Sequence, residues 1–204
     1  MRFGALVGGL FRVSTLLATF VSAEFSLSTY SSASDDRARD NQEIACLGLT
    51  IYHEARGESE RGKLAVGFVV LNRTHSSLFP GSVCGVVQQG GQQRYRCQFT
   101  WWCDGRSDQP KDQDVMRESL KLAEEIYYGC TPDPTSGALW YHSTAVKPSW
   151  SRSFGPGKRI DRHVFYRGDL NRPVQINASA RTSEGCGQRP STHPPLLTAA
   201  RSDS

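Results

Sequence analysis

The sequence lacks a strong excess of charge of either sign. Its 204 residues carry 24 Lys and Arg against 20 Asp and Glu, a formal net charge of +4. Two of the basic residues, Arg2 and Arg12, lie in a segment that we expect to be removed, which leaves 22 basic and 20 acidic residues. No stripe of Lys and Arg and no long run of one charge is present, so we expect no nucleic-acid partner.

Long hydrophobic runs are also missing. The N-terminal apolar stretch, Val13–Val21, is too short to cross a bilayer as a helix. It follows early positive charge and ends at Val21-Ser22-Ala23, small residues typical of a cleavage site, which predicts a secretory signal peptide over 1–23. The alternative is an uncleaved membrane anchor. We expect a periplasmic or secreted protein with no stable membrane span after cleavage.

Close cysteine pairs of the C-x-x-C type, which zinc sites use, are absent. We therefore expect no metal and no cofactor, with zinc as the rival interpretation of the cysteines. An even number of cysteines in an exported chain indicates disulfides, and many complete pairings remain open. Cys97 and Cys103 bracket a short loop and are the easiest local pair. The six are Cys46, Cys84, Cys97, Cys103, Cys130 and Cys186.

The chain divides by composition into four parts. Residues 24–40 are polar and aperiodic and predict a linker, 41–168 carry the core pattern of one domain, and 169–204 predict a disordered tail. Within the domain, apolar spacing and capping residues predict helices over 42–56, 60–74 and 112–128, with Ser59 as an N-cap and Gly129 as a stop. Leu64, Phe68 and Leu71 mark the expected buried face of the second helix. The stretches "GALWYHS" and "HVFYR" predict strands.

Glu54 occupies an unusual position for a carboxylate. Leu47, Ile51 and Glu54 are spaced i, i+4 and i+7, so Glu54 continues the apolar stripe of its helix. It also falls in the last turn, where the helix dipole disfavours negative charge. Both effects raise a carboxyl pKa, as a general acid requires. The alternative is a buried structural carboxylate that pairs with Arg56.

Glu58 lies just beyond the Gly57 break, at the start of the next helix, where the dipole stabilises an ionised acid. We expect it to be a structural carboxylate, in a pair with Arg56. Glu54 and Glu58 could also be the two carboxylates of a glycosidase, and the break at Gly57 leaves their separation open.

Trp and Tyr residues gather in the second half of the domain, and such side chains suit the flat faces of sugar rings. Gln98 beside Phe99 is a candidate for hydrogen bonding an acetamido group. His142 and His163 each fall in a predicted strand, where a lone histidine is more often structural. Many of the aromatic residues could equally be core.

Five blocks in fixed order give a resemblance over residues 43–167. They are "CLGLTIYHEARGESERGKLAVGFVVLNR", "FPGSVCGVVQQ", "CQFTWWCDG", "GALWYHSTAVKPSW" and "RHVFYR". Together they resemble the cell wall hydrolase family of the spore cortex-lytic enzymes, in the Gram-negative form. The resemblance implies a lysozyme-like α+β fold in which helices pack with a small antiparallel sheet. It also implies that Glu54 is the catalytic acid and that peptidoglycan glycan strands are the substrate.

Members of this family resemble lytic transglycosylases, which cleave between N-acetylmuramic acid and N-acetylglucosamine and leave 1,6-anhydro ends. A lone acid suits that route, because the substrate hydroxyl supplies the nucleophile. Gln98, Phe99, Tyr141 and His142 are expected to contact the sugars, with Arg56, Glu58 and His163 in support. His53 departs from the family pattern, where an aromatic residue is more usual.

Other functions remain open at this point. A hydrolytic muramidase would use the same Glu54 with water as nucleophile, and a non-catalytic peptidoglycan-binding module would bind without releasing product. An amidase is less compatible, since such enzymes usually need a metal or a cysteine site. We expect the protein to act as a monomer on peptidoglycan.

Overall fold

The structure is a computed structural model that describes residues 18–91, 93–168 and 186, with side chains described from Ser34 onward. The chain forms two compact units, Met1–Arg39 and Asp40–Ser204. The first helix, α1, runs from Ala18 to Ala55. Residues 24–40, predicted as a linker, are therefore helical, which their polar, aperiodic composition did not indicate. Apart from Cys186, the predicted tail lies outside the described residues, as does most of the predicted signal peptide.

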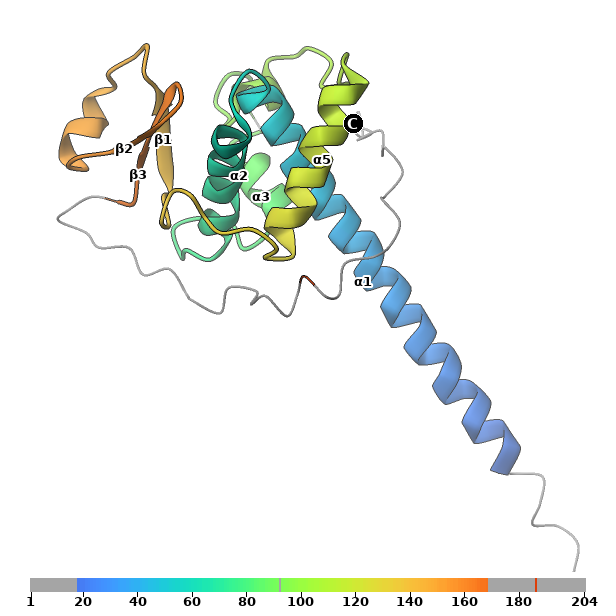
Figure 1. Ribbon diagram of the computed structural model, residues 1–204. Helices are drawn as coiled ribbons and strands as arrows, with labels where there is room; N and C mark the ends of the chain where they lie inside the picture. Colours follow the sequence, from blue (N-terminus) through green and yellow to red (C-terminus); the bar gives the residue numbers. More distant parts are fainter. Residues whose placement is uncertain (1–17, 92, 169–185, 187–204) are drawn as a thin grey trace, which may run out of the picture. The chain divides into compact units, whose positions relative to one another are not determined.

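In the described part of the second unit, four further α-helices follow, of which Figure 1 labels α2, α3 and α5. Local capping explains their limits: Ser59 accepts a hydrogen bond from the Gly62 amide, and Asp112 accepts from the amides of Asp114 and Val115. Gly129 adopts a φ of +71° just beyond the last long helix, which confirms it as the stop. The helices are α2 (Glu60–Thr74), α3 (Val83–Val87), α4 (Thr100–Cys103) and α5 (Gln113–Tyr127).

A three-stranded antiparallel sheet follows the helices in the chain, which confirms the α+β class. Its order is β1-β3-β2, so β1 and β2 are the edges. The strands are β1 (Trp140–Ser143), β2 (Lys158–Ile160) and β3 (His163–Tyr166). Two of them match the predicted strands; β2 is too short and too exposed to produce an alternating pattern. A 3-10 helix, Ser149–Ser153, lies between β1 and β2.

Two groups of buried side chains form the core. The main cluster joins α1, α2, α3 and α5 through residues such as Leu47, Val70 and Ile126. The sheet cluster consists of Ala55, Ala65, Val66, Val69, Ala138, Ile160 and Phe165. Helix α2 contributes to both clusters, so its buried surface is wider than the single face predicted from Leu64, Phe68 and Leu71. Leu64 and Leu71 are only partly buried, whereas Val66 and Val69 are fully buried.

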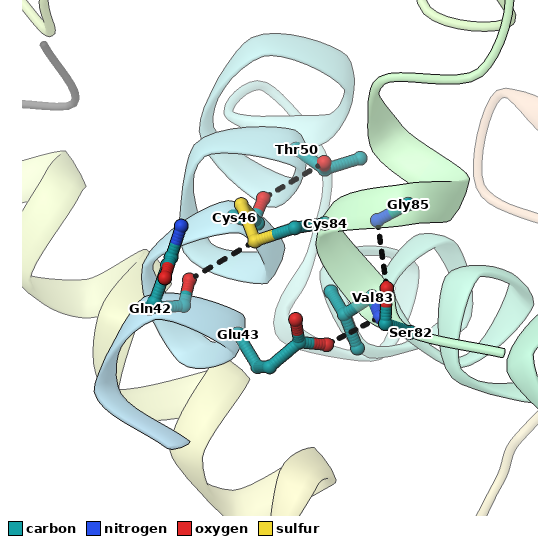
Figure 2. Close-up of a disulfide and its surroundings, with 8 residues drawn as sticks. All are labelled: Gln42, Glu43, Cys46, Thr50, Ser82, Val83, Cys84 and Gly85. Atoms are coloured by element: carbon teal, nitrogen blue, oxygen red, sulfur yellow. Dashed lines mark hydrogen bonds between the residues drawn. A yellow bond between two sulfur atoms is a disulfide. The ribbon is translucent and has the colours of Figure 1, made fainter. Parts of the chain in front are cut away.

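Disulfides use all six cysteines, which confirms the predicted bridges, including Cys97–Cys103. Cys46–Cys84 joins α1 to α3, and Cys130–Cys186 joins the end of α5 to the C-terminal segment. Beside the first bridge, Glu43 accepts a hydrogen bond from the backbone amide of Val83 (Figure 2). The Cys46–Cys84 bridge and the Glu43 bond hold α1 about two to three turns before Glu54.

Candidate active site

Glu54 lies in the last turn of α1, half-buried between fully buried neighbours. Ile51 and Ala55, on either side of it, have exposed fractions of 0% and 1%. The helix therefore presents the carboxyl group at the edge of the core, as its place on the apolar stripe predicts. The carboxylate sits where solvent meets the packed interior.

Tyr141, on β1, supplies the hydrogen-bond partner of this carboxylate. Its hydroxyl donates to Glu54 Oε2 at 3.3 Å, across 87 residues of sequence. The Tyr141 ring stacks on Phe165 and meets His163 edge-on, with centroid distances of 5.6 and 5.4 Å. It packs against both core clusters. The phenol is thus held in place by the sheet and aimed at the end of α1.

Burial perturbs both groups of this pair. Desolvation raises the pKa of Glu54, and the hydrogen bond from Tyr141 opposes that rise only in part. Desolvation and the adjacent Glu54 charge raise the pKa of Tyr141 well above its ordinary value. Tyr141 therefore remains a neutral donor, and Glu54 holds its proton at higher pH than an exposed carboxyl group does. These are the properties of a general acid.

Arg73, at the end of α2, is a functional candidate that the sequence-based predictions missed. Its side chain is 2% exposed, its Nε donates to the Leu139 carbonyl at 2.8 Å, and its Nη1 has no hydrogen-bond partner among the described residues. Burial lowers its pKa to about 10, so the guanidinium stays charged at neutral pH, and its charge acts on Tyr141. A buried cation therefore acts on Tyr141, the hydrogen-bond partner of Glu54.

The spacing of Arg73 contains a signal that could have revealed it. Val66, Val69, Val70 and Arg73 recur at i, i+3, i+4 and i+7, and the three valines have 0% exposure. Arg73 thus continues a buried stripe on α2, as Glu54 does on α1. A charged residue at such a position is costly unless it has a partner or a task.

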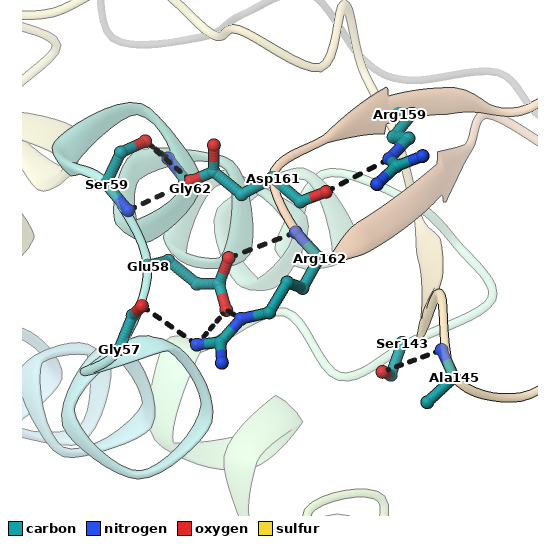
Figure 3. A network of polar contacts seen from close by, with 9 residues as sticks. All are labelled: Gly57, Glu58, Ser59, Gly62, Ser143, Ala145, Arg159, Asp161 and Arg162. Carbon is teal, nitrogen blue, oxygen red and sulfur yellow. Dashed lines mark hydrogen bonds and ion pairs between the residues drawn. The ribbon is translucent and has the colours of Figure 1, made fainter.

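Glu58 pairs with Arg162 rather than with Arg56, which corrects the predicted partner. Its side chain is 4% exposed and accepts hydrogen bonds from Arg162 Nε at 2.7 Å and from the Arg162 amide at 3.1 Å (Figure 3). Arg56 is exposed and instead lies over the Tyr52 ring, 5.5 Å from its centroid. Glu58 is therefore tied to the turn between β2 and β3.

A second contact strengthens the same junction. The Ser59 hydroxyl and amide both donate to Asp161 Oδ2, at 2.5 and 2.9 Å (Figure 3). Any side chain on Gly62 would collide with this carboxylate, which explains the glycine in the first turn of α2. These bonds lock the turn after Glu54 to the sheet that carries Tyr141, and so fix the geometry of the pair.

The other predicted site residues occupy different places. Phe99 is 2% exposed in the main cluster, 5.9 Å from the Arg73 guanidinium, while Gln98 is exposed on the preceding loop. His163 is buried against Tyr141 and supports its ring. His142 follows Tyr141 on β1, so its side chain lies on the opposite face of the sheet.

His53, the residue noted as unusual, has a structural explanation. Its ring stacks on Trp101 at 4.5 Å, and its Nε2 donates to the Asp108 carbonyl at 3.1 Å. Desolvation lowers its pKa, which favours the neutral ring. His53 therefore attaches the end of α1 to the loop before α5, next to Glu54. No cluster of three or more metal-ligating side chains occurs in the described part of the chain.

Comparisons with known proteins identify a family and several relatives of this chain. Residues 57–166 match the model of a protein family described as Cell Wall Hydrolase. The spore cortex-lytic enzyme of Bacillus subtilis (strain 168) is 35% identical over 127 residues, which cover 61% of this chain and 37% of that enzyme. The spore cortex-lytic enzyme of Halalkalibacterium halodurans is 32% identical over 126 residues, or 61% of this chain and 34% of that enzyme. The chain thus spans little more than a third of the length of these relatives.

Two solved structures are also similar. The catalytic domain of the Bacillus cereus SleB protein aligns with a TM-score of 0.48 and 28% identity, over 61% of this chain and 88% of that domain.

Proposed function

The chain belongs to the cell wall hydrolase family, and on this basis we propose that it cleaves peptidoglycan glycan strands between N-acetylmuramic acid and N-acetylglucosamine. Glu54 is the general acid and base, and the reaction is that of a lytic transglycosylase. The observation that carries the proposal is the half-buried Glu54 carboxyl group, with its raised pKa and its Tyr141 partner. The domain has the α+β organisation expected of a lysozyme-like enzyme.

In the first step, protonated Glu54 donates its proton to the glycosidic oxygen as the bond from that oxygen to C1 of the muramic residue breaks. This leaves a carboxylate in a partly desolvated site. The Tyr141 hydroxyl then donates to an ionised acceptor, and such bonds are stronger than neutral ones. The charge of Arg73 acts on Tyr141, the donor of this bond. The Tyr141 hydroxyl therefore stabilises the carboxylate that forms during the step.

In the second step, the Glu54 carboxylate accepts the proton of the muramic C6 hydroxyl while that oxygen bonds to C1. The product is a 1,6-anhydro end, and the hydroxyl proton returns Glu54 to its protonated state. The absence of an obvious second acid supports this route: no other carboxylate in the described residues contributes to the pKa of Glu54. Glu58 and Asp161 are already engaged by Arg162 and Ser59.

Product mass separates the candidate reactions. The full chain, acting on purified murein sacculi, should release fragments with anhydro ends, which are lighter by one water than the reducing ends left by a muramidase. Glu54→Gln keeps the shape of the side chain but removes the transferable proton, so release should fall by roughly 10²–10⁴-fold. Binding to sacculi without any release by the wild type would indicate a binding module and contradict the proposal.

We further propose that the protein is exported. Three disulfides in a small domain are typical of an oxidising compartment. The short apolar stretch before Ala23 is the predicted signal, so the mature chain should begin near Glu24. Cell fractionation with N-terminal sequencing tests this, and protein with an intact Met1 in the cytoplasmic fraction would contradict it. No helix among the described residues is both long enough and apolar enough to cross a bilayer.

A further inference from the structure

The sheet has a second face, and a hollow of about 540 Å³ opens on it. Side chains alternate along β1, so Tyr141 faces Glu54 while His142 faces the hollow. His142, Val164 and Tyr166 form its floor, and the segment 144–152 contributes one wall. The volume is in the range of small-molecule and peptide sites.

Both ring nitrogens of His142, on the floor of the hollow, already have hydrogen-bond partners. Its Nδ1 donates to the Ser143 carbonyl at 2.8 Å, which leaves Nε2 to accept from the Tyr166 hydroxyl at 3.0 Å. The ring also stacks on Tyr166, and Trp150 meets both rings edge-on. A ligand in the hollow would therefore be recognised by the groups around its rim.

That rim is positively charged and carries no acid. Lys147, Arg152 and Arg159 line the hollow, all three exposed, and no Asp or Glu is among the lining residues. None of the three forms an ion pair in the described structure; Arg159 Nε donates to the Asp161 carbonyl (Figure 3). We call this site, defined by Lys147, Arg152 and Arg159, the cationic hollow.

The concentration of charge is local rather than general. The whole sequence has a net charge of only +4, yet three unpaired cations surround one cavity. Like charges around a cavity repel one another, and an anion in the hollow would relieve that repulsion. Guanidinium groups match carboxylates in a bidentate geometry, and Val146, 54% exposed on the rim, offers an apolar contact beside them.

We propose that the cationic hollow binds the carboxylates of the peptide stem that peptidoglycan carries on its muramic residues. The proposal rests on the function proposed above, because it assigns a second contact to the same substrate. Stem peptides combine free carboxylates with small alanine side chains, which suits two arginines beside a valine. β1 is an edge strand, and an extended peptide of four residues spans roughly 13–14 Å. In this proposal the stem passes around β1 from the Glu54 face to the hollow.

The first test measures cleavage by the full chain of two substrates, stem-bearing glycan strands and strands stripped of their stems. Arg152→Gln/Arg159→Gln should raise KM for the stem-bearing strands by about five- to tenfold, since exposed ion pairs are worth up to about 1 kcal/mol each. The kcat for those strands and the kinetics on bare strands should not change. Arg117→Gln/Lys121→Gln removes two cations from the exposed side of α5 and is the matched control.

The second test does not depend on catalysis. Calorimetry should show that the free stem tetrapeptide binds the wild type, and that this binding weakens as the salt concentration rises. The Arg152→Gln/Arg159→Gln variant should bind the peptide more weakly. The fully amidated peptide should not bind. Equal binding of the amidated peptide, or equal loss of activity on both strand types, would overturn the proposal. If the wild type cleaves neither substrate but binds the acid peptide, the proposed reaction fails and the stem site stands.

Discussion

Replacing Tyr141 with phenylalanine removes the one hydrogen bond that Glu54 receives in the described structure. Hydrogen bonds to charged groups are worth about 1.5–3 kcal/mol. The 3.3 Å distance is long for a hydroxyl donor, so we take the lower end, about 1.5 kcal/mol. The bond is strongest when Glu54 is ionised, that is, once its proton has moved to the leaving group. Tyr141→Phe should therefore slow glycan cleavage by roughly tenfold.

The same substitution should change the pH profile in a defined direction. The bond from Tyr141 lowers the pKa of Glu54, so its removal lets burial raise that pKa further. Glu54 must be protonated to start the reaction. The limb of kcat/KM that falls as pH rises should therefore move to higher pH in Tyr141→Phe, even though the maximal rate is lower.

The assay is the release of soluble fragments from sacculi across a pH series, with thermal unfolding as a check on folding. The ring of Tyr141 keeps its packing against Phe165, so the free energy of unfolding should change by no more than about 1.5 kcal/mol. Tyr127→Phe is the matched control, because that buried hydroxyl donates to Asp40 at 2.6 Å and not to Glu54. An unchanged rate and an unchanged falling limb in folded Tyr141→Phe would refute the reasoning.

Three further predictions concern stability. The folded-state pKa of Glu54 is raised, so just above the ordinary carboxyl pKa of 4.5 the folded protein binds more protons than the unfolded chain, and its stability falls as pH rises through that window. Glu54→Gln should therefore stabilise the protein more at pH 7 than at pH 4. Paired denaturant titrations measure this, and equal effects at both pH values would contradict it. Glu58→Gln weakens an ion pair whose Arg162 partner is 66% exposed, so the free energy of unfolding should fall by only about 1 kcal/mol. The melting temperature should drop, with a smaller effect on murein release. Loss of release in a folded variant would instead make Glu58 a catalytic residue. Removing the Cys46–Cys84 bridge, which closes a loop of 38 residues, should cost about 4 kcal/mol of unfolding free energy, and an unchanged denaturation midpoint would show that the bridge does not stabilise the fold.

Much of the framework follows from local patterns in the sequence. Ser59 and Asp112 cap helices that begin where predicted, and Gly129 ends one, because capping and left-handed geometry involve only neighbouring residues. The position of Glu54 at the edge of the core follows in the same way from its spacing with Leu47 and Ile51. The α+β class was implied by the family resemblance. It agrees with the apolar spacing of the long helices and with the aromatic and branched residues of two of the three strands.

The partners of these residues depended on the tertiary structure. Tyr141 reaches Glu54 across 87 residues, and Arg162 reaches Glu58 across 104. The predicted partner of Glu58 was Arg56, which is near in sequence but points to Tyr52 instead. Sequence spacing describes one helix or strand at a time, whereas these contacts are set by how α1 and α2 pack against a sheet formed much later in the chain.

The two faces of that sheet illustrate the same division. Alternation along β1 determines from sequence that Tyr141 and His142 point in opposite directions. It does not determine which face meets α1, because either face carries aromatic residues. Packing of Phe165 and Ile160 into the sheet cluster decides this: it turns Tyr141 toward Glu54 and leaves Arg152 and Arg159 around the hollow on the other side. The sequence of the helix by itself determined the position of Glu54. The tertiary structure decided its surroundings, because it buries one face of the sheet rather than the other.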